Sequence, residues 1–260
     1  MLNEKNNKVL FCGLTHVGQV FSIGWAEKIG KCAVYDFDQK KIDKFEKKIV
    51  TTEEPDLKKY LVKNKKKIKF IKSSQSIKDY KNIFLTLDTP LNLNGKPNVS
   101  YIFQTLIKLK KYLRKNANLI ITSQVYCGFC DDLKKKFFKD RKDINFIYMA
   151  ETLVMGNAFE RFINPERIIL GADKKVNFLK KFKKFRCKIF FYNLKQAELV
   201  KMAINLYLYN SVSYANLMDN YCRQFGFKFS EINDSIRSDK RIGFHSYISP
   251  SLGISGGHLE

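Results

Sequence analysis

Apolar runs of strand length alternate with amphipathic segments along most of the chain. Seven runs are rich in β-branched and aromatic side chains: residues 8–14, 32–38, 82–88, 117–125, 145–151, 167–172 and 188–193. The segments between them carry apolar residues at helical spacing over residues 16–30, 39–48, 100–115 and 131–140. This alternation predicts an α/β fold in which helices cover both faces of a doubly wound parallel sheet.

The pattern changes after residue 194. Residues 195–226 keep helical spacing without a proline and end at Gly226, which predicts one long helix. Residues 230–238 predict another helix, with Ser230 as its N-cap. We therefore expect an α/β domain over residues 1–194 and a helical domain, built on the long helix, over residues 195–260.

The long predicted helix is apolar on more than one side. Its large apolar residues are spread around the helix: Leu199, Met202, Ile204, Leu206, Leu208, Val212, Tyr214, Leu217 and Met218. A helix of this kind must be covered on more than one side. The sheet domain can cover one side, and we expect a second copy of the chain to cover the other in a symmetric homodimer.

The net charge of +23 raises the question of a nucleic-acid partner. Only 8 of the 48 basic residues are arginine, and the lysine runs at 63–69, 134–139 and 180–184 have the pattern of solvated surface faces. Nucleic-acid sites favour clustered arginine with interleaved aromatic residues. We therefore expect no nucleic-acid partner, although the charge can draw anionic small molecules toward a cleft.

Membrane and metal sites are also not expected. No apolar run approaches the length of a membrane span, and the first residues, MLNEKNNK, are polar, so the predicted location is the cytoplasm. The six cysteines are then expected to be small core residues. Cys127 and Cys130 form a C-x-x-C pair that lacks the partner ligands of a zinc site and does not open a predicted helix.

Residues 9–38 have the order strand, turn, helix, strand and acid that binds a dinucleotide. Gly13 and Gly18 flank the turn, and Thr15 stands where such turns usually carry another glycine. The start of the following helix, with His16 and Val17, is predicted to face a pyrophosphate. Asp36 is predicted to bind the ribose hydroxyls of NAD and to repel the extra phosphate of NADP. The alternative is a Rossmann-like scaffold with an empty site.

Five ordered stretches resemble the UDP-glucose/GDP-mannose dehydrogenase family. They are the turn at residues 11–42, LTLDTPLNLNGKPNVSYI at 85–102, NPERIILG at 164–171, the long helix at 197–226, and DKRIGFHSYISPSLGISGGHLE at 239–260. The resemblance implies a Rossmann NAD-binding domain followed by a central helical domain. It also implies a two-step, NAD-dependent oxidation of the C6 alcohol of a nucleotide sugar to a carboxylate, in polysaccharide or sugar-nucleotide metabolism.

The resemblance assigns roles to further residues. Lys201 and Asn205 lie four apart on one helix face, where the family's pair stabilises a developing negative oxygen. Glu151 is implied as a proton acceptor. The remaining implied contacts are Thr89 with the cofactor and Arg241, Gly256, Gly257 and His258 with the substrate, Arg241 across the dimer interface. The alternatives are a surface lysine at position 201 and an ordinary strand-terminal acid at position 151.

Several positions depart from the family pattern. Leu259 stands where the family has the cysteine that traps the aldehyde intermediate, and leucine offers no nucleophile. Gln124, Tyr126 and Met155 replace the family's Thr, Pro and second Glu, and the Cβ of Thr15 is expected to crowd the pyrophosphate. The family also continues with a second Rossmann-like domain for the nucleotide, which the resemblance does not reach within the 260 residues.

Two functions follow as hypotheses. The first is an NAD-dependent oxidoreductase-like protein limited to a two-electron alcohol–carbonyl step, because the four-electron oxidation needs the missing cysteine. The second is a catalytically silent scaffold or regulatory binding protein that keeps the fold. Cofactor binding discriminates between them, since an oxidoreductase must bind NAD and a scaffold need not.

Overall fold

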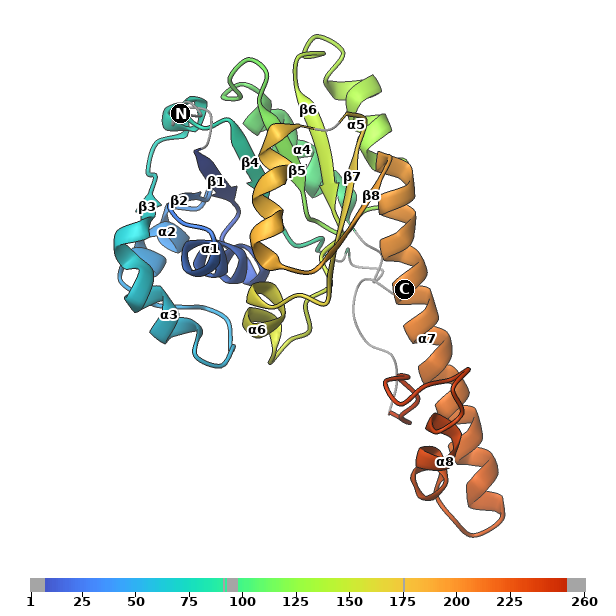
Figure 1. Ribbon diagram of the computed structural model, residues 1–260. Coiled ribbons are helices and arrows are strands. Elements are labelled where there is room, and N and C mark those ends of the chain that lie inside the picture. The colour runs from blue at the N-terminus through green and yellow to red at the C-terminus, as the bar shows by residue number, and fades with distance from the viewer. Residues whose placement is uncertain (1–7, 91, 93–97, 175, 252–260) are drawn as a thin grey trace. The chain divides into compact units, whose positions relative to one another are not determined.

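The computed structural model describes residues 8–90, 92, 98–174 and 176–251 (Figure 1). The chain divides into two compact units. The first unit comprises residues 1–90 and 98–199, and the second comprises residues 91–97 and 200–260.

A single sheet forms the centre of the first unit. Across its described residues, eight strands follow the order β3-β2-β1-β4-β5-β6-β7-β8. The strands are β1 Val9–Cys12, β2 Cys32–Tyr35, β3 Ile68–Phe70, β4 Asn82–Leu85, β5 Asn118–Ile121, β6 Asn145–Met149, β7 Arg167–Ala172 and β8 Lys188–Tyr192. The order reverses between β1 and β4, so the sheet is doubly wound as predicted.

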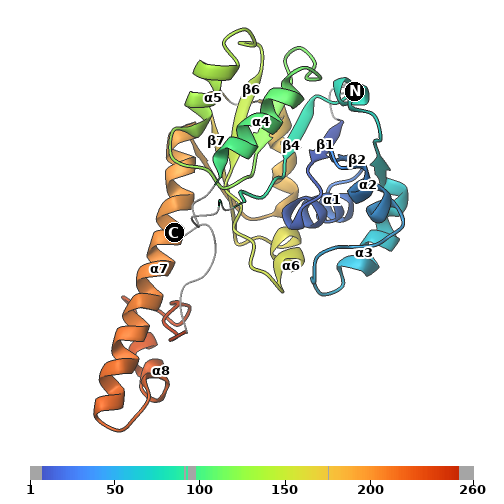
Figure 2. The same ribbon diagram turned by 180° about the vertical axis from the view of Figure 1, so that it is seen from behind.

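Helices cover both faces of this sheet (Figures 1 and 2). The helix α1 (His16–Lys28) packs against α3 (Leu57–Asn64) and α6 (Ala158–Ile163) on one face. The helices α4 (Val99–Lys110) and α5 (Phe129–Phe137) lie on the other face (Figure 2). The helix α2 (Gln39–Glu46) follows β2, and 3-10 turns occupy Lys65–Lys67, Ser74–Asp79 and Asn177–Phe185.

Aromatic side chains fill the core between α1 and the face of the sheet that this helix covers. The rings of Phe11 and Phe84 from β1 and β4 stack with centroids 4.8 Å apart. Trp25 of α1 lies 5.9 Å from Phe178, so the segment Asn177–Phe185 covers the same face as α1. Such ring pairs contribute about 0.5–1.5 kcal/mol each beyond the burial of their area.

The expectation of a wholly parallel sheet is wrong at one pair of strands. Tyr148 of β6 pairs with Gly171 of β7 in an antiparallel ladder, while β7 and β8 are again parallel. The chain leaves the carboxyl end of β6, forms α6 beside α1, and re-enters the sheet from that same edge. The strand β7 must therefore run against β6, because no crossover helix returns the chain to the opposite edge.

The second unit contains most of α7 (Leu194–Gln224), a 3-10 turn at Phe229–Glu231, and α8 (Asn233–Arg237). Its described core is small, with Ala215, Cys222 and Phe229 buried. The prediction of Ser230 as an N-cap is wrong, because Ser230 lies inside the 3-10 turn and α8 begins at Asn233. The fully buried Phe229, whose N–H donates to Asp219, holds this turn in place. No helix in the described ranges is long and apolar enough to cross a membrane.

Candidate cofactor and active site

The turn after β1 is built so closely that two positions accept only glycine. Gly13 has a φ of +110°, and a Cβ there would lie 2.7 Å from the carbonyl oxygen of Thr86. A Cβ on Gly18 would lie 1.8 Å from the carbonyl oxygen of Gly13. The backbone of Gly13 therefore meets the backbone of α1 at Gly18 with no side chain between them, as the predicted dinucleotide turn requires.

Two threonines hold this turn against β4. The Thr86 hydroxyl donates to the carbonyl oxygen of Gly13 at 2.7 Å. The Thr15 hydroxyl donates to the carbonyl oxygen of Thr86 at 2.8 Å. Thr15 is also the N-cap residue of α1. Because its hydroxyl is directed to Thr86, its side chain does not cap the helix. The first turn of α1 also holds no acidic residue, so its N–H groups at His16, Val17 and Gly18 suit an anion.

Asp36 lies beside this turn, as predicted. Its Oδ2 accepts the N–H of Leu14 at 2.7 Å, and its Oδ1 accepts the N–H of Asp38 at 2.9 Å. The parallel pairing of β1 and β2 brings the residue to the turn, because both strands end at the same edge of the sheet. Each carboxylate oxygen keeps a further lone pair, so Asp36 can also accept hydrogen bonds from two vicinal hydroxyls.

A buried glutamate, Glu54, joins α1 to the segment that follows β6. Its side chain has no exposed surface, and its Oε1 lies 2.8 Å from Nε2 of His16. It also accepts the N–H of Gly156 and the N–H of Ala158, each at 2.9 Å. Burial alone would raise the pKa of Glu54, but the bonds from Gly156, His16 and Ala158 outweigh it and the pKa is lowered. Sequence reasoning missed this residue.

A second buried side chain, Gln19, fixes the segment that carries Glu54 to α1. The amide of Gln19 accepts the N–H of Thr51 at 3.0 Å and donates to the Thr51 hydroxyl at 2.6 Å. Gln19 and His16 lie one turn apart on α1, so the residues from Thr51 to Glu54 are held at two points. The imidazole of His16 is therefore engaged inside the protein, which leaves its backbone N–H for a ligand at the turn.

The other predicted residues of the first unit lie at the same edge of the sheet. Thr89 follows β4, is buried, and donates to the carbonyl oxygen of Gln124 at 2.6 Å. Glu151 follows β6, is half-buried, and accepts the N–H of Leu153. Gly13, Asp36, Thr89 and Glu151 thus come from the carboxyl ends of four different strands of one sheet. In open α/β sheets this edge is where ligands bind.

The remaining predicted residues lie in the second unit. Lys201 and Asn205 share a face of α7, and Lys201 is only 8% exposed, which is unlike a solvated surface lysine. Arg241 is exposed, and its guanidinium donates to both carboxylate oxygens of Asp239. Gly256, Gly257, His258 and Leu259 lie outside the described residues.

The C-x-x-C pair does open a helix, contrary to the prediction. The helix α5 begins at Phe129, between Cys127 and Cys130. The fully buried Glu198 of α7 caps this helix by accepting the N–H of Gly128 at 2.6 Å and the N–H of Cys130 at 2.9 Å. Burial, together with Glu198, raises the pKa of the Cys130 thiol well above its usual range, so this thiol is a poor nucleophile.

Comparison with known proteins assigns the family. The sequence profile of the UDP-glucose/GDP-mannose dehydrogenase family, NAD binding domain, matches residues 7–185. The profile of the same family's central domain matches residues 195–260. The chain belongs to the UDP-glucose/GDP-mannose dehydrogenase family. An NAD-binding domain of this family supports a nicotinamide dinucleotide as the cofactor.

Individual relatives agree with this assignment. The chain is 26% identical over 257 residues to UDP-glucose 6-dehydrogenase of Rickettsia bellii, covering 95% of this chain and 59% of that protein. It is 28% identical over 261 residues to UDP-glucose 6-dehydrogenase of Campylobacter jejuni, covering 96% and 64%. The fold matches a UDP-glucose dehydrogenase from Pyrobaculum islandicum with a TM-score of 0.89 at 22% identity, covering 98% and 61%. The chain therefore spans about three-fifths of the length of these relatives.

Proposed function

We propose that this chain binds NAD and acts as an oxidoreductase on a nucleotide sugar, in polysaccharide or sugar-nucleotide metabolism. The observation that carries the proposal is the turn at Gly13–Gly18, where a Cβ on Gly18 would strike the carbonyl oxygen of Gly13 at 1.8 Å. A turn this close, followed by an uncapped helix start, is a cradle for a pyrophosphate. The residues present therefore fit the dinucleotide.

Each residue of the turn has a distinct task in this proposal. The N–H groups of His16, Val17 and Gly18 bind the pyrophosphate oxygens. The carboxylate of Asp36 accepts hydrogen bonds from the ribose hydroxyls and repels the 2′-phosphate of NADP. Thr89, which follows β4 and donates to the carbonyl oxygen of Gln124, contacts the cofactor. Bound NAD would supply the hydride acceptor, and the protein would supply orientation and charge.

The proton and the oxygen of the substrate alcohol are assigned to further residues. We assign to Lys201 and Asn205 the stabilisation of negative charge that develops on the substrate oxygen. Glu151 accepts a proton, and Arg241, Gly256, Gly257 and His258 contact the substrate. Leu259 offers no thiol for covalent capture, so the reaction is expected to stop after one hydride transfer, with one NADH formed per sugar.

Two residues favour a silent scaffold as the second candidate. Leu259 removes the nucleophile, and Thr15 places a side chain in the turn where a glycine is usual. A scaffold of this kind keeps the fold but need not bind NAD, whereas an oxidoreductase must. The two candidates therefore differ in a single measurable property, which is the affinity for the dinucleotide.

We also propose that the chain forms a homodimer through α7. Leu206 is 61% exposed and Leu217 is 67% exposed on this helix, which is a large exposure for leucine side chains on one element. Among the described residues of the second unit five apolar residues are buried, which is too few to stabilise a helix of this length alone: Val212, Ala215, Cys222, Phe229 and Ile248. A second copy that covers α7 would remove this apolar surface from water.

The proposed function is tested by calorimetric titration of the chain with NAD and with NADP. We expect NAD to bind and NADP to bind more weakly, and replacing Asp36 by Ala should reduce this preference by about tenfold. An exposed acid outside the site, Glu53, provides the control substitution to Ala. Absence of NAD binding would support the scaffold, and tighter binding of NADP than of NAD would overturn the role of Asp36.

Turnover is measured with UDP-glucose and GDP-mannose by the absorbance of NADH and by mass spectrometry of the sugar. The proposal predicts at most one NADH per sugar and no sugar acid. A uronic acid formed with two NADH per sugar would show that Leu259 does not prevent the second oxidation.

A further inference from the structure

A large cavity lies at the opposite edge of the sheet from the candidate cofactor site. Its volume is about 710 Å³, and it is bordered by the end of α5, the loop to β6 and the residues that follow β7. Ile144 and Asn145 line it at the amino end of β6, whereas Glu151 lies beyond the carboxyl end of that strand. The five residues of β6 separate the two places by about 16 Å.

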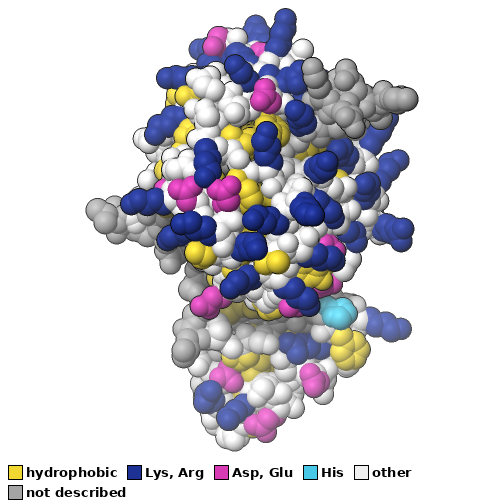
Figure 3. Space-filling view, turned by 90° about the vertical axis from the view of Figure 1, so that its left-hand side faces the viewer, with side chains coloured by type: hydrophobic (Ala, Val, Ile, Leu, Met, Phe, Trp, Pro, Cys, Tyr) yellow, Lys and Arg dark blue, Asp and Glu magenta, His cyan; other side chains and the backbone are white. Residues whose placement is uncertain are grey.

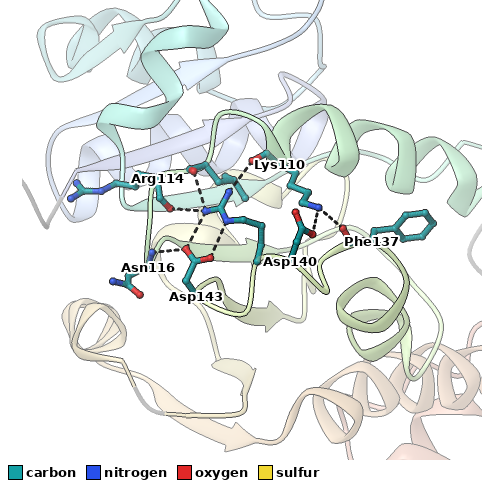
Figure 4. Close-up of polar contacts among 8 residues, drawn as sticks. Lys110, Arg114, Asn116, Phe137, Asp140 and Asp143 are labelled. Atoms are coloured by element: carbon teal, nitrogen blue, oxygen red, sulfur yellow. Dashed lines mark hydrogen bonds and ion pairs between the residues drawn. The ribbon is translucent and has the colours of Figure 1, made fainter.

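The loop that borders this cavity is held rigidly (Figure 4). The guanidinium of Arg141 donates to both carboxylate oxygens of Asp143, at 2.9 and 3.1 Å. It also donates to the carbonyl oxygens of Lys110, Leu113 and Arg114. The bonds from Arg141 lower the pKa of Asp143 to about 2, although burial opposes this. Arg141 is therefore a structural residue of the cavity wall, and its charge is neutralised.

Two other cations near the cavity are also neutralised. Lys110 donates to the carbonyl oxygen of Phe137 at 2.9 Å and pairs with Asp140 (Figure 4). Lys134 pairs with Asp131 at 2.8 Å and with Asp173 at 2.9 Å. Asp173 is the one acid that lines the cavity among its described residues, and Lys134 already binds it.

Four lysines on the cavity lining remain without an acid. They are Lys135, Lys139, Lys142 and Lys174, all exposed, and in the described part of the chain none of them forms an ion pair. They come from α5, the loop to β6 and the residues after β7, so they reach the cavity from different sides. Basic side chains are spread over the surface elsewhere, as one face of the molecule shows (Figure 3), but these four lysines line a cavity.

The interior of the cavity is apolar. Phe138, Ile144 and Phe146 line it, and the rings of Phe138 and Phe146 meet edge to face at 5.2 Å. Cavities of about 300–1,000 Å³ with an apolar interior and a few charged groups are typical of sites for small organic ligands. An apolar floor below four ammonium groups selects a ligand with a ring at one end and several negative charges at the other.

We propose that this cavity is a second binding site, distinct from the dinucleotide turn, and that it takes a nucleoside polyphosphate. Lysine ammonium groups bind phosphate oxygens as point charges, and several of them are needed to offset three or four negative charges. The nucleoside contacts the apolar interior, and the phosphates lie at the lysines. This proposal is independent of the proposed function, because no residue of the dinucleotide turn lines the cavity.

The test uses calorimetry with ATP, tripolyphosphate and adenosine as probes, in the presence of saturating NAD. The full chain is compared with the double variant Lys139→Glu, Lys142→Glu. The control is Lys58→Glu, Lys65→Glu, which makes the same change of net charge at exposed lysines of α3 and the following turn. We expect the cavity variant to bind ATP about tenfold more weakly than the control, because two charges that attract the phosphates are replaced by two that repel them.

The probes separate this site from simpler explanations. ATP should bind more tightly than tripolyphosphate, and adenosine should bind weakly, because both the ring and the charges contribute. Equal ATP affinity of the two double variants would overturn the proposal, because the cavity lysines would then have no special role. Tripolyphosphate binding as tightly as ATP would overturn the role of the apolar interior. A DNA duplex serves as a further probe. If both double variants lose affinity for the duplex and for ATP to the same extent, the lysines act as a diffuse basic surface and the proposal is overturned.

Discussion

Replacing Glu54 by alanine tests whether one buried carboxylate holds the cofactor edge of the sheet together. Three donors converge on it: Nε2 of His16 at 2.8 Å and the N–H groups of Gly156 and Ala158 at 2.9 Å. Alanine removes the acceptor from all three while leaving the donors in place. A buried donor left without a partner costs about 1–3 kcal/mol.

The expected loss of stability is about 3–5 kcal/mol. Three orphaned donors would cost about 3–9 kcal/mol together, and water that enters the vacated space keeps the loss at the lower end of that range. A domain of this size loses roughly 2–4 °C of its melting temperature per kcal/mol, so the first unit should unfold roughly 10 °C earlier. Glu54→Gln keeps one acceptor oxygen without the charge and should lose about half as much.

The neighbouring Glu53 is exposed and provides the matched control. Calorimetry should show Glu53→Ala within about 0.5 kcal/mol of the parent protein. Because folding lowers the pKa of Glu54, its contribution to stability is present above the ordinary value of 4.5 and is lost as the pH falls through the lowered value. The gap between the parent protein and Glu54→Ala should therefore shrink under acid conditions. Equal melting temperatures for Glu54→Ala and Glu53→Ala at neutral pH would refute the reasoning.

Three further predictions concern the turn, the chemistry and the assembly. Thr15→Gly should bind NAD several-fold more tightly than Thr15→Ser in calorimetry, because it removes the Cβ beside the expected pyrophosphate path. If Thr15→Gly binds NAD more weakly than Thr15→Ser, the hydrogen bond from residue 15 to Thr86 matters more than the crowding. Lys201→Ala should lower any NADH formation about a hundredfold without changing NAD affinity, whereas Lys195→Ala, an exposed lysine on the same helix, should not. Leu217→Lys should convert a dimer to a monomer in light scattering, and an unchanged mass would contradict the interface on α7.

The order of strands and helices in the first unit was largely predictable, because local periodicity is set by neighbouring residues. The prediction failed where elements are short. The strand β3 has three residues, of which only Ile68 is buried, and α6 has six, so neither is long enough to repeat its pattern twice. The antiparallel run of β7 was also not predictable, since a βαβ rhythm carries no signal for the edge at which the chain re-enters the sheet.

The residues of the candidate site were likewise predictable only in part. Gly13, Gly18 and Asp36 were found from the sequence alone, because a dinucleotide turn places its glycines and its acid at nearly constant spacing along one βαβ unit. Glu54 and Glu198 carry no such signal. Glu54 is 38 residues from His16 and 102 residues from Gly156, and Glu198 is 68 residues from Cys130. Only the folded sheet brings these carboxylates to their donors, and only burial among those donors makes an ordinary acid indispensable there.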